Sequence, residues 1–235
     1  MGVTLIAGHH YTQQDVMGTL RALPAWWSQL LDGREVPADV VAIRAIYDIP
    51  LSDGSADEHV GRSLEQLAVA TRRLREVGAM PTRATGSIAQ LSASSGGVPK
   101  RSVEQITITR NGVVGDGQSH RVHHGRPWQA MCLWAAEVVD AFTADGHPIS
   151  YGSAGENITT VGIDWSSIGT GVRLQVGTAL LECSLWALPC SANTRWFTGG
   201  NFNLMHHEHG PVSRMYAWVI EPGVVALGDQ IIVEP

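Results

Sequence analysis

The feature that most constrains the fold is a change of pattern after Pro81, where helical periodicity gives way to short β-branched runs. Gly, Ser and Thr become more frequent there, as is typical of short strands joined by tight turns. The runs that predict strands are SIAQLSA, VEQITITR, RLQVGTALLECSLWAL and DQIIVEP. Many short strands with Gly-rich turns favour a mainly β (α+β) fold that closes, fully or in part, into a barrel.

One helix is expected inside this β-rich part, over the segment WQAMCLWAAEVVDAF that begins near Pro127. Proline suits the first turn of a helix, where its missing N–H would have no partner. The Ser-rich segment SASSGGVPK follows an apolar run, so it predicts the end of a strand and a tight turn as readily as a linker.

Residues 1–82 predict a small helical segment instead of strands. Its clearest helix spans about residues 55–77 and ends before Gly78 and Pro81. Shorter helices are expected over about 20–31 and 39–47. The apolar face of the clearest helix consists of Val60, Leu64, Leu67, Leu74 and Val77. We therefore divide the chain into a helical N-terminal segment of unknown role (1–82) and a β-rich domain (83–235).

Charge and hydropathy exclude several classes of protein. A net charge of -6 argues against a general nucleic-acid binder, because phosphate neutralisation needs clustered Lys and Arg. No apolar run approaches the roughly 20 residues that span a bilayer. The N-terminal residues also lack the basic region and the apolar length of a secretory signal. We expect a cytoplasmic protein that contacts neither nucleic acid nor membrane.

The single lysine of the chain, Lys100, excludes further classes of enzyme. A pyridoxal-phosphate enzyme needs a lysine for its Schiff base, and Lys100 lies in a Gly-Gly-Val-Pro-Lys turn without a surrounding cofactor domain. Ser-Lys hydrolases and Walker-type loops are excluded on the same ground. No pyridoxal phosphate is expected.

The three cysteines are an odd number without the spacing of a disulfide framework, so we expect thiols. Cys132 and Cys183 lie in apolar runs and predict small buried side chains. Cys190 differs because it follows Pro189, where a strand pattern stops and a polar segment begins. It is the best candidate for a reactive thiolate.

From Gln90 to the C-terminus the chain carries a series of ordered motifs. They are QLSASSGGVPKR, GVVGDGQSHRVHHGRPWQA, GENITTVGIDW and RLQVGTALLECSLWALPC. Together they resemble the MOSC family, named for the C-terminal domain of molybdenum cofactor sulfurases. The resemblance implies a MOSC-type β-barrel with an inserted helix, and it leaves residues 1–82 outside.

The resemblance also implies a cofactor and a site. The Pro-Cys of the last motif matches the family's reactive cysteine, so Cys190 is expected to ligate molybdenum held by molybdopterin or to carry a persulfide. Candidate catalytic residues beside Cys190 are His123, His124 and Asp116. Candidate contacts to the anionic cofactor are Lys100, Arg101, Arg121, Arg126 and Asn157. Arg195 and Arg214 were weaker candidates, since each alone is more typical of a surface charge.

The histidines allow more than one interpretation. One group comprises His120, His123 and His124, and the other His206, His207 and His209. They could form a zinc or iron site across a barrel mouth, relay protons, or be solvated loop residues. His9, His10 and His59 lack the further ligands that a structural zinc site needs.

Three functions follow as alternatives. The leading one is a molybdenum-dependent reductase of N-hydroxylated or N-oxide substrates, similar to the catalytic part of the mitochondrial amidoxime-reducing proteins. The second is a sulfur carrier with a persulfide on Cys190, and the third is a non-catalytic binding module. The first needs an external electron donor, since the chain has no flavin, iron–sulfur or nicotinamide motif, and the second needs a sulfur donor protein. A small-molecule substrate is expected, and a homodimer is left open.

Overall fold

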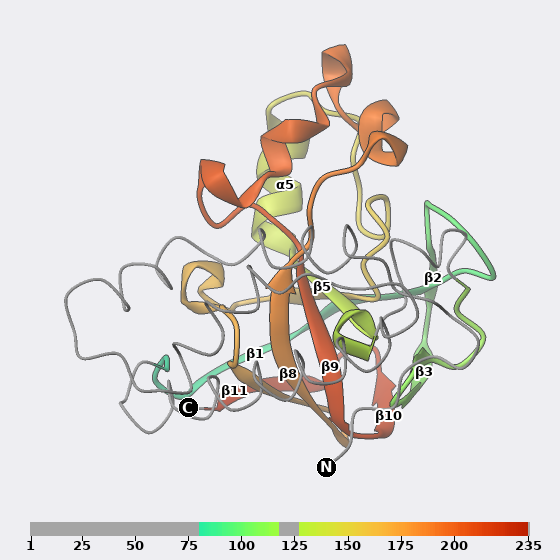
Figure 1. The fold of residues 1–235 in the computed structure, drawn as a ribbon, viewed down its shortest axis with the longest axis vertical. Coiled ribbons are helices and arrows are strands. Elements are labelled where there is room, and N and C mark those ends of the chain that lie inside the picture. The colour runs from blue at the N-terminus through green and yellow to red at the C-terminus, as the bar shows by residue number, and fades with distance from the viewer. Residues whose placement is uncertain (1–79, 118–126, 235) are drawn as a thin grey trace, which may run out of the picture.

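The computed structural model describes residues 80–117 and 127–234 (Figure 1). Within these ranges the expected mainly β fold is confirmed, because seven strands form a closed barrel in which the last strand pairs back onto the first. In barrel order they are β1 (Ala84–Ala93), β6 (Ile158–Val161), β5 (Met131–Ala135), β9 (Met215–Glu221), β8 (Ala179–Trp186), β7 (Arg173–Val176) and β11 (Gln230–Glu234). No helix of these ranges is long and apolar enough to cross a membrane.

Strand β1 closes the barrel because it pairs with two neighbours in succession. Residues 84–87 pair antiparallel with β11, and residues 87–91 pair antiparallel with β6, with a register shift between Ile88 and Gln90. Such an irregularity bends a strand and increases its twist. The end of β1 also pairs with the short strand β2 (Arg101–Val103), which carries the chain away from the barrel.

Strand β5 corrects the helix that the sequence predicts from Pro127 onward. Pro127–Gln129 form a 3-10 turn (η1), Met131–Ala135 form strand β5, and only Ala136–Ala144 form the α-helix α5. All five residues of β5 are buried, between antiparallel β9 and parallel β6. A strand buried on both faces loses the alternation of apolar and polar residues, so its pattern resembles that of a buried helix.

The other predicted strands are confirmed, although one predicted run can contain more than one strand. The run VEQITITR contains β3 (Gln105–Thr109) and begins with the last residue of β2, and the long run before Pro189 contains β7 and β8. Strand β3 pairs with β10 (Gly223–Ala226) and β4 (Gly112–Val113) in a second, smaller sheet. Exposed and buried residues alternate along β3, and its Ile106 and Ile108 join the barrel core.

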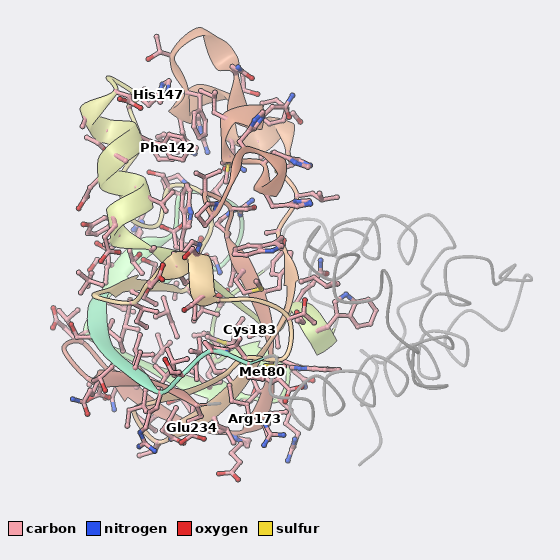
Figure 2. The ribbon with its side chains drawn as sticks, turned by 90° about the vertical axis from the view of Figure 1, so that its left-hand side faces the viewer. Met80, Phe142, His147, Arg173, Cys183 and Glu234 are labelled. Carbon is pink, nitrogen blue, oxygen red and sulfur yellow. The ribbon has the colours of Figure 1, made fainter. Side chains whose placement is uncertain are left out.

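A layer of short turns lies beyond one end of the barrel, beside α5 (Figures 1 and 2). Its 3-10 turns are η3 (Ser191–Trp196), η4 (Thr198–Gly200), η5 (Phe202–Met205) and η6 (His207–His209), while η2 (Trp165–Ser167) follows β6. The Phe197 ring lies 5.3 Å from Phe142 of α5 and 5.2 Å from His147, centroid to centroid. His147 Nδ1 accepts the Thr198 N–H at 3.1 Å. These contacts fix the chain that follows Cys190 against α5.

Several expectations lie outside the described residues. They are the helices over about 20–31, 39–47 and 55–77, together with His9, His10 and His59. The division of the chain at residues 82 and 83 stays a prediction, although β1 begins at Ala84.

Candidate functional site

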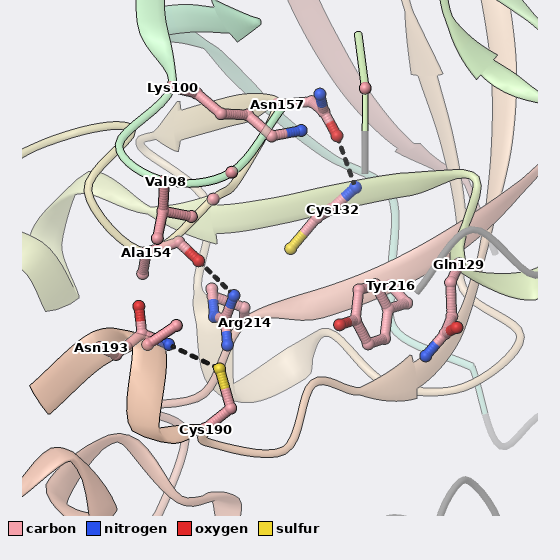
Figure 3. Close-up of a pocket in the computed structure, with 14 residues that line it drawn as sticks. Val98, Lys100, Gln129, Cys132, Ala154, Asn157, Cys190, Asn193, Arg214 and Tyr216 are labelled. Carbon is pink, nitrogen blue, oxygen red and sulfur yellow. Dashed lines mark hydrogen bonds between the residues drawn. The ribbon is translucent and has the colours of Figure 1, made fainter. Parts of the chain in front are cut away.

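A pocket of about 120 Å³ lies where the β5 and β9 strands meet the turns that follow β1 and β8 (Figure 3). This volume suffices for several waters or one small functional group. Its wall includes two of the three cysteines, Cys132 and Cys190, and the guanidinium of Arg214. Lys100 and Asn157 line the opposite side. The pocket therefore joins thiols to cationic and amide groups.

Strand register explains how these side chains meet. Cys132 of β5 pairs directly with Tyr216 of β9, so both side chains lie on the same face. Because side chains alternate along an extended chain, Arg214 lies on the face of Tyr216. The Ala187 N–H donates to the Arg214 carbonyl at 2.8 Å, which ties the chain leaving β8 to the start of β9. Cys190, three residues later, thereby reaches the pocket.

Arg214 is the most unusual residue of the pocket because it is a buried cation, with only 4% of its surface exposed. Its Nη1 donates to the Ala154 carbonyl, whereas Nε and Nη2 have no hydrogen-bond partner among the described residues. Burial alone would lower the pKa of the guanidinium. When ionised, nearby Cys132, Tyr216, Cys190 and Glu156 act in the opposite direction and raise the pKa, so Arg214 stays charged.

Glu156 is buried near Arg214 without forming an ion pair with it. Its Oε1 accepts the Gly152 N–H at 2.5 Å, and its Oε2 has no partner within the described ranges. Burial raises the pKa of this carboxyl, so Glu156 is a poor counter-charge for Arg214. The Gly152 bond instead shapes the loop whose Ala154 carbonyl accepts from Arg214. Glu156 thus helps to hold the guanidinium in place.

Cys190 is half-buried, and its sulfur faces the pocket (Figure 3). The Asn193 side-chain amide donates to Cys190 Sγ at 3.6 Å, and the Asn193 N–H donates to the Cys190 carbonyl at 3.0 Å. The Arg214 guanidinium lines the same pocket, so the Cys190 sulfur has a cationic neighbour. Reactive cysteines characteristically combine partial exposure with such a cationic neighbour.

Cys132 lines the same pocket but is a different kind of thiol. Only 5% of its surface is exposed, and it packs with Ala187 and Tyr216. Burial raises the pKa of the Cys132 thiol to about 11, although the charge of Arg214 acts in the opposite direction. Cys132 therefore stays a neutral thiol near neutral pH, and Cys190 is the better candidate for chemistry.

A network centred on Asp116 builds the opposite wall. Its Oδ2 accepts from Lys100 Nζ at 2.5 Å and from Asn157 Nδ2 at 3.0 Å, and its Oδ1 accepts the Ser94 N–H at 2.8 Å. The side chains of Lys100 and Asp116 are only 8% and 4% exposed. Asn157 Oδ1 also accepts the Cys132 N–H at 3.3 Å. The Asp116 carboxylate thus links three segments of the chain, those that contain Ser94, Lys100 and Asn157.

We expect Asp116→Ala to lower the free energy of unfolding by about 3–5 kcal/mol, because it leaves the Lys100 ammonium buried without its counter-charge. Chemical denaturation would measure the change. Asp140→Ala is the matched control, since Asp140 accepts an exposed hydrogen bond from Tyr151, and its cost should stay below about 1 kcal/mol. Equal, small losses in the two variants would show that the network does not stabilise the fold.

Comparison with known families assigns this β-rich part of the chain. The family model described as the MOSC domain matches residues 120–232, a range that contains Cys132, Asn157, Cys190 and Arg214. The chain contains a MOSC domain. The resemblance expected from the sequence motifs is thereby confirmed.

Two bacterial relatives of this MOSC protein match part of it. The uncharacterized protein YflK of Bacillus subtilis (strain 168) is 28% identical over 137 residues, which cover 57% of this chain and 62% of YflK. The protein YiiM of Escherichia coli (strain K12) is 28% identical over 130 residues, which cover 52% of this chain and 56% of YiiM. The chain therefore aligns with less than two thirds of the length of either relative.

Solved structures share the MOSC fold seen here. The YuaD protein from Bacillus subtilis superposes with a TM-score of 0.55 at 18% identity, over 65% of this chain and 97% of that chain. YiiM from Escherichia coli superposes with a TM-score of 0.50 at 22% identity, over 66% of this chain and 71% of that chain. At these identities the likeness concerns the fold alone.

The structure gathers some of the predicted site residues of the MOSC domain. Cys190, Lys100 and Asn157 line the pocket, while Asp116 lies behind Lys100 and bonds to it. Arg101 is exposed at the start of β2 and does not line the pocket. The candidates that lie outside the described residues are His120, Arg121, His123, His124 and Arg126.

The remaining candidates differ from their expected positions. Arg214 is buried in the pocket wall, which corrects its interpretation as a surface charge. Arg195 is exposed, stacks on Trp196 at 4.7 Å and donates to the Val98 carbonyl. His206 stacks on His207, with 4.4 Å between ring centroids. Among the described residues, no group of three His, Cys, Asp or Glu side chains is placed to hold a metal.

Four polar or thiol side chains of the pocket were not singled out from the sequence: Gln129, Tyr216, Asn193 and, as a pocket residue, Cys132. A signal existed for one of them, Tyr216. Alternation along MYAWVI places Tyr216 on the face of Arg214, and a charged residue directly before an apolar strand would have indicated a polar site. Nothing in the local sequence indicates Asn193 or Gln129, because the folding of distant segments brings them to the pocket.

The three cysteines should differ in how fast they are alkylated. We expect iodoacetamide to label Cys190 near neutral pH, while Cys132 and Cys183 stay unlabelled in the folded chain because both are buried. Labelling of Cys132 should begin only as the pH approaches about 11, its pKa, or after unfolding. Peptide mass spectrometry after timed labelling measures this. Faster labelling of Cys132 than of Cys190 would contradict the assignment.

Proposed function

We propose that this MOSC protein binds a molybdenum cofactor through Cys190 and reduces N-hydroxylated or N-oxide compounds. The observation that carries the proposal is the half-buried Cys190 thiol in a pocket beside the buried Arg214 guanidinium. A thiolate suits a soft or borderline metal centre, and a neighbouring cation favours the thiolate. The family supports the same cofactor, because MOSC domains are associated with molybdenum cofactor.

The chemistry of the groups that line the pocket suits the metal-bearing end of such a cofactor. A molybdenum centre held by a pterin dithiolene can take one protein thiolate as a further ligand, which Cys190 would supply. The cofactor is anionic, and the pocket presents two cations, Lys100 and Arg214, of which Arg214 has no carboxylate partner within the described ranges. Close backbone approach is possible at Gly155, where a Cβ would lie 2.9 Å from Val98 Cγ1.

The bound cofactor would supply two-electron redox chemistry at the pocket. The reduction R–NH–OH + 2e⁻ + 2H⁺ → R–NH₂ + H₂O breaks the N–O bond, and the electrons come from an external donor protein. The chain itself would hold the cofactor with Cys190, Lys100 and Asn157 and place the Arg214 guanidinium beside the Cys190 sulfur. His123 and His124 are proposed to deliver protons, and Asp116 to hold Lys100 in place.

A sulfur carrier is the second candidate. The same exposure and the same cationic neighbour that favour a metal-binding thiolate also favour a persulfide on Cys190. This function would add the mass of one sulfur to Cys190 and would not require molybdenum. Intact-mass analysis of freshly isolated protein, before and after a reductant, distinguishes it from the reductase.

The experiment for the leading proposal is a turnover assay with an artificial electron donor. Protein made in a host that synthesises molybdenum cofactor would be reduced with dithionite and viologen dye and then offered a hydroxamic acid or an N-oxide. We expect substrate-dependent oxidation of the dye and formation of the reduced product. A molybdenum-loaded protein that oxidises the dye with none of these substrates would contradict the reductase.

A further inference from the structure

Two pocket residues beside Cys190 present buried hydrogen-bonding groups that no described residue satisfies. Arg214 offers the donors Nε and Nη2, and Asn193 offers the acceptor Oδ1, all without a partner among the described residues. Both side chains are nearly fully buried, with exposures of 4% and 1%. Figure 3 shows them on either side of the Cys190 sulfur, to which the Asn193 amide nitrogen donates.

Buried groups of this kind are rare in folded proteins because an unpaired donor or acceptor loses its hydrogen bonds to water. The fixed positions of both residues make the arrangement specific. Arg214 is held by the Ala154 carbonyl, and Asn193 by its bonds to Cys190. A ligand that satisfies both must present an acceptor to Arg214 and a donor to Asn193.

We propose that Arg214 and Asn193 form a two-sided subsite that recognises an N–OH group and distinguishes N-hydroxylated compounds from N-oxides. In a hydroxamic acid or an amidoxime, an acceptor oxygen or nitrogen lies next to an N–H or O–H donor. An N-oxide has the acceptor alone, so it leaves Asn193 Oδ1 unpaired. This subsite rests on the proposed reduction, because that reaction places the N–O group beside Cys190.

The same logic excludes a simple anion as the best ligand of the subsite. A carboxylate or a fully ionised oxyanion satisfies Arg214 but places oxygen lone pairs against the Asn193 acceptor. Asn193 is therefore the specificity-determining residue, and Arg214 contributes to every oxygen ligand. Sites built to bond a substrate hydroxyl or N–H reject analogues that lack it, because the site's own group is then left unpaired.

Binding of three small probes tests the subsite. The full chain would be titrated by calorimetry with acetohydroxamic acid, trimethylamine N-oxide and acetate. We expect acetohydroxamic acid to bind at least about tenfold more tightly than the other two. Asn193→Leu should remove this preference by weakening the hydroxamic acid about tenfold while leaving the N-oxide unchanged. Arg214→Lys should weaken all three probes, because the ammonium does not reproduce the guanidinium geometry.

Thr194→Val is the matched control because Thr194 is an exposed residue of the same 3-10 turn, bonded to the Ser191 carbonyl. It should bind all probes like the wild type. Should Asn193→Leu unfold, as its denaturation midpoint would show, Asn193→Ala replaces it. If the hydroxamic acid bound by chelating a metal, replacement of Asn193 would not change its affinity. Asn193→Leu therefore distinguishes metal chelation from recognition by the subsite.

Equal affinity for the three probes, no binding of acetohydroxamic acid, or an unchanged preference in Asn193→Leu would each overturn the subsite. These titrations need neither electrons nor molybdenum. If the chain prefers acetohydroxamic acid but never acquires molybdenum, the proposed reduction is refuted and the subsite is supported. A molybdenum-loaded reductase without a preference would refute the subsite alone.

Discussion

Replacing Cys190 with serine is expected to abolish molybdenum retention and to lower turnover of an N-hydroxylated substrate by at least about 100-fold. Removal of a residue that merely orients a metal ligand already costs about 10–100-fold. Removal of the ligand itself should cost more, because a serine hydroxyl stays protonated near neutral pH and is a harder donor than a thiolate. Metal analysis and the dye-linked assay measure the two effects.

The fold should survive this substitution. Cys190 is half-buried at the start of η3, so its replacement should change the free energy of unfolding by less than about 1 kcal/mol. Cys183→Ala is the matched control, because it removes a thiol from the core of the barrel instead of the pocket. It should keep the metal and the activity. Retention of both by Cys190→Ser would remove Cys190 from the site.

Arg214→Gln is expected to lower turnover by about 100-fold or more while changing stability little. Removing one preorganised donor or cation from an active site commonly costs about 10²–10³ in rate. Here the substitution also removes the charge that faces the Cys190 sulfur, so labelling of Cys190 by iodoacetamide should slow as well.

We expect Arg214→Gln to change the free energy of unfolding little, because Arg214 forms no ion pair with a described carboxylate. Arg214 has no ion-pair partner among residues 80–117 and 127–234, and such a buried cation contributes little net stability, so its replacement by a neutral amide should shift the free energy of unfolding by less than about 2 kcal/mol. Arg83→Gln is the matched control, since Arg83 is exposed before β1, and it should change neither rate nor labelling. A large loss of stability with normal Cys190 reactivity would make Arg214 a structural residue only.

The strand pattern made much of this fold predictable. Strand β3 alternates between exposed and buried residues, so its sequence alone indicates a half-buried strand. Strand β5 could not be predicted in the same way, because all of its residues are buried between two neighbours. The information that makes Met131–Ala135 a strand lies in its pairing with distant segments, which local periodicity does not report.

The candidate site shows the same division. Cys190 could be predicted because a polar segment begins at a Pro-Cys after a strand, and the structure places it in a pocket. The burial of Arg214 could not be predicted from the sequence, because it depends on contacts with β5 and with the loop at Ala154. Asp116 stays a proposed site residue, yet its three hydrogen bonds show that it positions Lys100 and Asn157.

The most direct measurement is the molybdenum and pterin content of the wild-type chain purified from a host that makes the cofactor. A thiolate ligand at Cys190 predicts about one molybdenum and one pterin per chain, both lost on denaturation. A chain that is folded, carries a free Cys190 thiol and contains neither molybdenum nor pterin would contradict the account.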